Sequence, residues 1–199
     1  MRRHSGLRIP ITTLATLAQF PSLSLLALAA KKLAPSDEAA ITTFCQQCSA
    51  FFTLVAGEAH AADTARQLLE ARPRSVDVTR KHVIGFERGG ALIAIVALLE
   101  GYPDEANWYV GLLLLSPDVR ARGLGTAIWT ATETWIRGEG GTHARLIVQE
   151  QNPDAARFWR TVGFSANGTT EQYSPTCTNR CWCFEKPLIE SRREHAFIE

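Results

Sequence analysis

The chain has 199 residues, of which 46% are apolar and 21% charged, and its formal net charge is +1. This length and composition are typical of one globular domain and leave little room for two. The charged residues are scattered evenly rather than gathered into a basic stripe, so no nucleic-acid-binding surface is predicted.

The five cysteines do not fit a secreted disulfide framework, because their number is odd and the chain is large enough to fold without such links. Reduced thiols are therefore expected. One interpretation joins Cys45 and Cys48 with Cys177, Cys181 and Cys183 into a zinc site. No histidine stands at zinc-finger spacing, however, and the spacing of Cys45 and Cys48 favours a shared buried face of one helix. We expect no metal.

The N-terminal segment, residues 1–30, begins basic, becomes apolar and contains an Ala-Leu-Ala sequence where a signal peptidase could cut. Against a signal peptide, Pro10 and Pro21 divide the segment, and its uninterrupted apolar part is short. That part is also far too short to cross a bilayer. We expect a loosely ordered extension over residues 1–22, a first strand from Ser24 to Lys31, a cytoplasmic location and no membrane attachment.

The first half of the remaining chain alternates between helical and strand patterns. Residues 35–52 begin with a Ser or Asp cap and place apolar residues at helical spacing, which predicts one helix. A second helix is predicted over 61–73. Two apolar runs within 81–103, separated by Gly89 and Gly90, predict an antiparallel hairpin, and the run over 108–118 predicts a central strand.

The second half continues this mixed pattern. Residues 125–141 have the apolar spacing of a helix that ends in a glycine cluster, and 144–151 read as a strand. Within 152–164, Asn at the first position, Pro at the second and Gly near the end are the expected start and stop residues of a helix. Segments 164–174 and 180–188 predict a final antiparallel hairpin.

The junction between the central strand and the next helix carries the sequence VRARGLGTAI, from Val119 to Ile128. A helix N-terminus presents unpaired N–H groups and a partial positive charge. Gly123 and Gly125 remove side chains that would keep an anion away, and the neighbouring arginines and Thr126 add charge and a hydroxyl. The junction therefore predicts a site for a pyrophosphate.

Two common phosphate-binding loops fit this junction poorly. A Walker loop requires Lys followed by Ser or Thr after its last glycine, where this chain has Thr126 and Ala127. A dinucleotide-binding fingerprint requires a third small residue where the chain has Ile128, and it normally opens its domain.

The junction instead resembles the loop of the GNAT superfamily of acyl-CoA-dependent N-acyltransferases. That loop has Arg or Gln, two residues, Gly, one residue, and Gly or Ala, after a strand that ends in Leu-x-Val-x-Pro. This chain has Leu113 and Pro117 in the strand motif, with Leu115 in place of Val, followed by Arg120, Gly123 and Gly125.

A second segment resembles the same superfamily one strand and one helix later. Its pattern is Asn, Ala, an aromatic pair and Gly-Phe, which the chain matches with Asn152, Ala155, Phe158, Trp159, Gly163 and Phe164. Two motifs in the right order identify the chain as a member of the superfamily. The detailed match runs from about Trp108 to Phe164.

The resemblance implies an α/β (α+β) fold of the GNAT type. The expected sheet is mixed and mostly antiparallel, with about six or seven strands, splayed between strands 4 and 5 and flanked by about four helices. We expect this N-acetyltransferase domain to extend over residues 23–190 and a polar tail to follow over 191–199.

The resemblance also implies acetyl-CoA as the co-substrate. The backbone of Leu113 and Leu115 would pair with the pantetheine arm, and a backbone N–H near Leu115 would polarise the acyl carbonyl. Asn152, Phe158 and Trp159 would border the pantetheine and the thioester. The pyrophosphate would be held by the loop residues Arg120, Ala121, Arg122, Gly123, Leu124, Gly125 and Thr126.

The implied reaction is direct attack of a primary amine on the thioester through a tetrahedral intermediate. Because an alkylamine is mostly protonated near neutral pH, the site must first accept a proton. Glu100 and Glu150, at strand ends, are candidates for this base, although both could equally be solvated charges. Trp159 stands where many relatives have a proton-donating Tyr, and an indole cannot act as an acid. Tyr173 or water could replace it, and Trp159 could simply belong to the core.

The acceptor is predicted only as an amine of a small molecule or peptide. His60 is a weak candidate for an acceptor contact, and Trp108 and Tyr109 for the pocket wall. The replaced Tyr motivates one alternative, a CoA-binding sensor without acetyl transfer. Another is an acetyltransferase of the toxin or antibiotic-modifying type. Monomer and homodimer are both compatible with the sequence.

Overall fold

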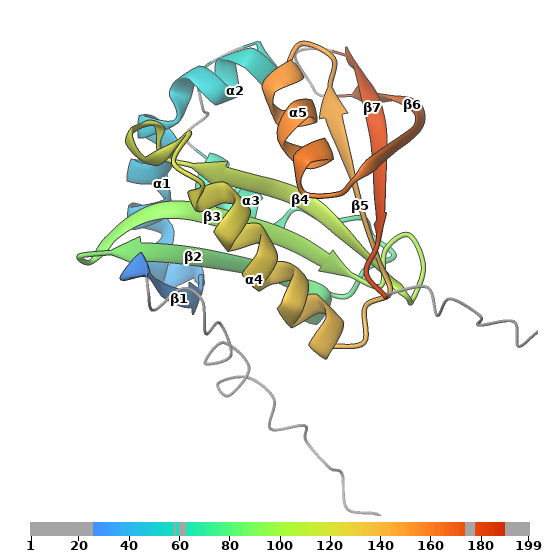
Figure 1. Cartoon of the computed structure of the whole chain (residues 1–199). Coiled ribbons are helices and arrows are strands. Elements are labelled where there is room, and N and C mark those ends of the chain that lie inside the picture. The colour runs from blue at the N-terminus through green and yellow to red at the C-terminus, as the bar shows by residue number, and fades with distance from the viewer. Residues whose placement is uncertain (1–25, 58, 60–62, 174–177, 190–199) are drawn as a thin grey trace, which may run out of the picture.

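The computed structural model describes residues 26–57, 59, 63–173 and 178–189. His60, Cys177 and the expected N-terminal extension and C-terminal tail lie outside the described residues. In chain order, the strands and α-helices (Figure 1) are β1 (Ala29–Lys32), α1 (Glu38–Gln47), α2 (Ser49–Ala56), α3 (Thr64–Glu70), β2 (Lys81–Arg88), β3 (Ala91–Glu100), β4 (Asn107–Leu115), α4 (Leu124–Gly138), β5 (His143–Gln149), α5 (Pro153–Thr161), β6 (Ser165–Tyr173) and β7 (Thr178–Pro187).

One seven-stranded sheet organises the described residues, in the order β1-β2-β3-β4-β5-β7-β6. Every neighbouring pair is antiparallel except β4 and β5, which run parallel. The predicted mixed, mostly antiparallel sheet is therefore confirmed. The described residues form five α-helices rather than about four, because the segment predicted as a first helix forms two.

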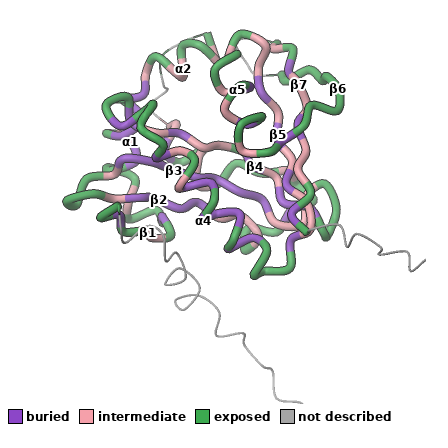
Figure 2. The backbone as a smooth tube through the Cα atoms, in the orientation of Figure 1, coloured by how far each residue is buried: buried purple, intermediate pink, exposed green. Residues whose placement is uncertain are grey.

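Helices cover both faces of the sheet, and each face has its own apolar core. The core on the α4 and α5 face contains Trp108, Trp129 and Trp159, whereas the core on the α1 and α3 face contains Ile41 and Phe44. Strand β3 is buried along most of its length, which explains its almost uninterrupted apolar sequence (Figure 2).

Strands β4 and β5 separate soon after they begin to pair. Their pairing is limited to residues Asn107 to Tyr109, opposite His143 to Arg145. Just beyond this point, the register between β3 and β4 shifts by one residue. On β3, Ala97 and Leu98 are adjacent, but their partners on β4 are Leu112 and Val110. Gly111, between these partners, is the extra residue of a β-bulge. The two strands diverge from there in Figure 1, as the expected splay requires.

The single helix predicted over 35–52 is wrong, because α1 and α2 meet at an angle of 75°. Neither glycine nor proline marks the bend, which tertiary contacts explain instead. The Cys48 thiol, at the bend, donates to the Leu115 carbonyl of β4, 3.6 Å away. Farther along α2, the carbonyls of Leu54 and Val55 accept hydrogen bonds from the side chains of Gln151 and Asn179.

The first strand is shorter than predicted and begins later, at Ala29 rather than Ser24. Ser24 itself lies outside the described residues. Ala27 has a φ of 52°, which an extended strand does not adopt, so the strand cannot continue N-terminally through it.

No single helix of the described chain is long and apolar enough to cross a membrane. Helices α1 and α2, together with the turn before them, reach that length and composition only as a bent pair, and α1 buries Ile41, Phe44 and Cys45 within the fold.

Gly141, just after α4, is a position where the packing excludes any side chain. A Cβ atom there would lie 2.5 Å from Ile136 Cγ2 and 2.5 Å from Trp108 Cδ1, both in the core. We expect Gly141→Ala to lower the free energy of unfolding by about 1–3 kcal/mol, as overpacking of a core does. Urea unfolding followed by tryptophan fluorescence measures this effect.

Gly138→Ala is the matched control, because a Cβ atom at this last residue of α4 has no neighbour within 4 Å. It should leave stability unchanged or raise it by up to about 1 kcal/mol. Equal unfolding midpoints for the two variants would contradict the described packing of Gly141.

Candidate functional site

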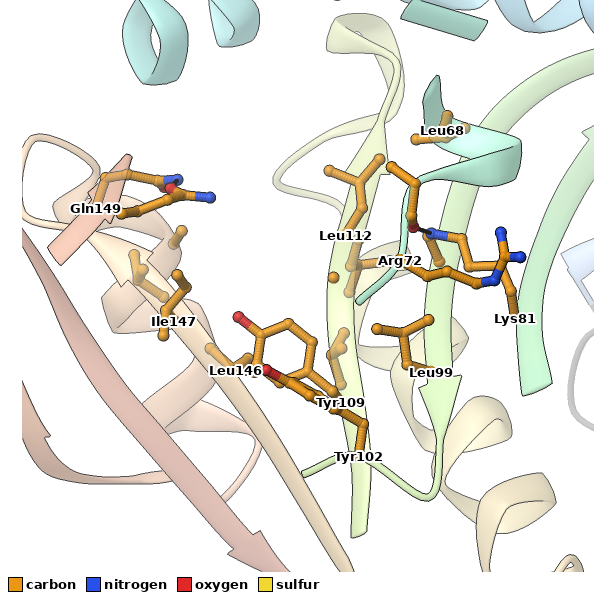
Figure 3. A pocket seen from close by; sticks show the side chains of 18 of the residues that line it. Leu68, Arg72, Lys81, Leu99, Tyr102, Tyr109, Leu112, Leu146, Ile147 and Gln149 are labelled. Atoms are coloured by element: carbon orange, nitrogen blue, oxygen red, sulfur yellow. Dashed lines mark hydrogen bonds between the residues drawn. The ribbon is translucent and has the colours of Figure 1, made fainter. Parts of the chain in front are cut away.

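The gap between β4 and β5 contains a cavity of about 440 Å³ (Figure 3). The two strands form its sides, through Leu112 and Leu113 on β4 and Ile147 and Val148 on β5. Leu112 belongs to the α1 and α3 face and Leu113 to the α4 and α5 face. The cavity therefore passes through the sheet and opens toward both layers of helices.

The β4 backbone turns hydrogen-bonding groups into this gap. The N–H of Ser116 donates to the Ile93 carbonyl on β3, at 2.9 Å. Because backbone groups alternate sides along a strand, those of Leu113 and Leu115 point the other way, toward the position that β5 has left. An extended molecule can pair with such an edge as an additional strand.

The loop that follows β4 combines two left-handed residues with the start of a helix. Ala121 has a φ of 58° and Gly123 a φ of 75°. No side chain of the described residues caps α4, and its first backbone bond is donated by Ala127 to the Gly123 carbonyl, at 3.1 Å. The N–H groups of Leu124, Gly125 and Thr126 therefore precede the helical hydrogen bonds, an arrangement that suits an anion.

The two predicted loop arginines have different positions. Arg120 is exposed, and its Nε donates to the Leu115 carbonyl at 2.9 Å, so it fixes the loop to the end of β4. Arg122 is exposed and lines a smaller cavity of about 190 Å³ beside the start of α4, together with Gly123 and Arg88. Arg88, from the β2–β3 hairpin, adds a positive charge that the loop motif did not indicate.

The two loop glycines also differ in role. A Cβ atom at Gly125 would lie 3.3 Å from the ring of Phe158 and 3.9 Å from Leu115, so this glycine lets α4 pack closely against α5. A Cβ atom at Gly123 would meet nothing within 4 Å, and its positive φ favours glycine. Gly123 is thus the position whose missing side chain keeps the helix start open.

Helix α5 begins as the sequence predicts. The Asn152 side-chain carbonyl accepts from the Ala155 N–H at 3.2 Å, and Pro153 is the first helical residue. Asn152 and Trp159 both line the cavity. Trp159 is also a core residue, 6% exposed, with its ring 5.2 Å from that of Trp129.

Three residues were predicted to accept or donate a proton in the reaction, and none of them is among the described residues that line the cavity. Glu100 contacts His82 at 3.0 Å, and burial lowers the pKa of that histidine. Glu150 lies 3.4 Å from Arg180 Nε. Tyr173 is 73% exposed and donates to Glu171.

Two other tyrosines line the cavity at the point where β4 and β5 part. The rings of Tyr102 and Tyr109 are 5.6 Å apart, edge to face, and both hydroxyls point toward β5 in Figure 3. Burial raises the pKa of Tyr109, which keeps its phenol protonated. Tyr109 is a wall residue as predicted, but Trp108 is 1% exposed and packs on Trp135 in the core.

On the α3 face, two cations lie at the cavity. Lys81 Nζ donates to the Ala71 carbonyl at 3.0 Å, and Arg72 Nε donates to the Val76 carbonyl at 3.1 Å. Burial and, secondarily, the charge of Arg72 lower the pKa of Lys81 to about 8. Neither residue is predicted from the sequence, because the two segments carry no motif.

The cysteines of the described chain form no metal cluster with other ligand residues. Cys45 and Cys48 are both 1% exposed, in agreement with a shared buried face, and Cys181 and Cys183 are free thiols on β7.

Solved structures with the same fold are known. An acetyltransferase from Thermus thermophilus is 23% identical, with a TM-score of 0.63 over 81% of this chain and 97% of that one. The ribosomal-protein-S18-alanine N-acetyltransferase of Escherichia coli is 15% identical, with a TM-score of 0.62 over 85% and 99%. The PaiA N-acetyltransferase of Thermoplasma acidophilum, determined in complex with coenzyme A, is 16% identical, with a TM-score of 0.59 over 80% and 98%. At these identities the similarity shows the fold.

The search of curated proteins gave no match. The family model for the acetyltransferase (GNAT) family, in contrast, matches residues 48–164, which is more than half of the chain. The matched segment includes β4, the loop between β4 and α4, and α5. Together with the splayed sheet, this match shows that the chain belongs to the GNAT acetyltransferase family.

Proposed function

We propose that this protein transfers an acetyl group from acetyl-CoA to a primary amine of a small molecule or peptide. The observation that carries the proposal is the continuity of two features: the open backbone edge of β4 leads directly to the anion site at the start of α4. A long molecule with a strand-like arm and a diphosphate matches both features at once.

Each part of the site has a proposed role in holding acetyl-CoA. The backbone of Leu113 and Leu115 pairs with the pantetheine arm, and Asn152, Phe158 and Trp159 border it on the α5 side. The pyrophosphate is held by the loop from Arg120 to Thr126, with Arg120 as a positioning residue that bonds to the Leu115 carbonyl. The exposed charges of Arg122 and Arg88 add long-range attraction for the phosphates.

The proposed reaction is direct attack of the amine on the thioester, through a tetrahedral intermediate and departure of the thiolate. A backbone N–H of β4 that faces the gap polarises the acyl carbonyl. No carboxylate occurs among the described residues that line the cavity, so we propose that the proton of the amine leaves through water. Tyr109, whose phenol stays protonated, donates a proton to the leaving sulfur in place of the Tyr that many relatives have at the position of Trp159.

We also propose that the catalytic domain extends over residues 23–190 and that the protein acts in the cytoplasm. The four cysteines of the described residues are free thiols, which agrees with a reducing compartment.

Turnover of acetyl-CoA with a panel of amines, followed by thiol release, tests the function directly. Binding of CoA without turnover for any amine would instead support the CoA sensor. The phenols in the cavity favour the enzyme, because a sensor has no need of a proton donor there.

Gly123→Val should weaken CoA binding by about tenfold or more, because a β-branched side chain does not adopt the left-handed conformation and covers the helix start. Binding of pantetheine, which has no phosphates, should not change. Isothermal titration calorimetry measures both.

The control is Gly140→Val beyond the other end of α4, where φ is also positive and a Cβ atom also meets nothing within 4 Å. This variant introduces similar strain but should bind CoA normally. Equal affinities of the two variants for CoA would contradict the proposed phosphate site.

Tyr109→Phe should lower kcat by about tenfold or more while KM for acetyl-CoA stays unchanged, because it removes the proposed proton donor and keeps the ring. Steady-state thiol release measures both constants. Tyr102→Phe removes the neighbouring phenol and should have the smaller effect on kcat. The reverse order of the two effects would refute the role of Tyr109.

A further inference from the structure

The half of the cavity on the α3 face is cationic. Three cross-strand neighbours connect this half to the gap: Lys81 on β2 lies opposite Leu99 on β3, which lies opposite Tyr109 on β4. Lys81 therefore lies two strand spacings, about 10 Å, from the point where β4 and β5 part. Figure 3 shows its side chain extending toward Leu112, with Arg72 alongside.

Neither cation forms a salt bridge with a carboxylate of the described residues, although the charge of Arg72 contributes to the lowered pKa of the exposed Asp77, after the hydrogen bonds from Thr79. Their nitrogens donate to backbone carbonyls, those of Ala71 for Lys81 and of Glu70 and Val76 for Arg72. The pair formed by Lys186 and the buried Glu133 shows the contrast, because there the ammonium lies 2.5 Å from a carboxylate.

A partly buried ammonium without a counter-ion is costly to keep charged. The lowered pKa of Lys81 reflects this cost, and a bound anion would remove it. Arg72 uses Nε and one terminal nitrogen for backbone carbonyls, and its other terminal N–H groups can donate to a ligand. The two side chains can therefore both donate charge-assisted hydrogen bonds to one carboxylate.

We propose that the acceptor is an amine that also carries a carboxylate, with the carboxylate bound by Lys81 and Arg72 and the amine at the gap beside Tyr109. The walls between these two points are apolar and include Leu68, Leu99 and Leu112, which fit a hydrocarbon spacer. This inference rests on the proposed acetyl transfer and names its acceptor class. A diamine would instead place a second positive charge close to Lys81 and Arg72, which would repel it. No carboxylate among the described residues that line the cavity balances these charges.

The test compares linear primary amines of equal chain length that end in a carboxylate, a methyl group or a second amine. Purified full-length protein and acetyl-CoA are used, and thiol release gives kcat and KM for each. We expect kcat/KM for 6-aminohexanoate to exceed those for hexylamine and 1,6-diaminohexane by about tenfold or more. A preference for either of the other two would overturn the proposal.

Lys81→Met keeps most of the length of the side chain and removes its charge. It should raise KM for 6-aminohexanoate by about tenfold with little change in kcat, and leave KM for hexylamine unchanged. Lys32→Met, which removes an exposed lysine of β1, is the control and should leave all constants unchanged. An equal effect of Lys81→Met on both amines would contradict a carboxylate contact.

A binding measurement separates this inference from the proposed function. Calorimetry on the CoA-loaded protein should detect 6-acetamidohexanoate, the expected product, with at least about tenfold higher affinity than N-hexylacetamide, and Lys81→Met should abolish the difference. If this binding is observed but no amine is acetylated, the carboxylate site stands and the enzymatic function fails. If amines are acetylated but the two products bind equally, the function stands and the carboxylate site fails.

Discussion

The parting of β4 and β5 after Tyr109 is the constraint on which the rest of the site depends. A central strand normally uses its backbone groups on both sides, and unpaired ones are costly unless another molecule satisfies them. The bulge at Gly111 stands at this point, and beyond it the backbone of Leu113 and the N–H of Leu115 face an opening instead of a neighbouring strand, while the Leu115 carbonyl accepts from Arg120. The cavity and its openings toward both layers of helices follow from this local loss of pairing.

The features that the sequence predicts correctly are those set by local geometry. Gly123 directly precedes α4, and Asn152 caps α5 through the Ala155 N–H. The bend at Cys48 escaped prediction because it depends on contacts with Leu115 and with side chains far along the chain, not on a local helix breaker. The late start of β1 escaped it because apolar composition alone does not reveal the conformation of Ala27.

The candidates for proton transfer show the other limit. Glu100 stands next to Leu99 in the chain, but neighbouring side chains on a strand point to opposite faces, so Leu99 lines the cavity and Glu100 contacts His82. The same alternation separates Trp108, in the core, from Tyr109, in the cavity wall. Lys81 and Arg72 come together only through the pairing of β2 with β3 and the return of the chain from α3, which sequence spacing does not encode.

The passage through the sheet has a consequence for the order of events in catalysis. Because the opening reaches both layers of helices, a donor on the α5 side and an acceptor on the α3 side can be present at the same time. Such an arrangement suits a ternary complex, in which neither molecule must depart before the other arrives. A double-displacement route would require a side chain to carry the acyl group. Cys48, the cysteine beside β4, is ill suited to that task, since its thiol bonds to the Leu115 carbonyl and burial raises its pKa.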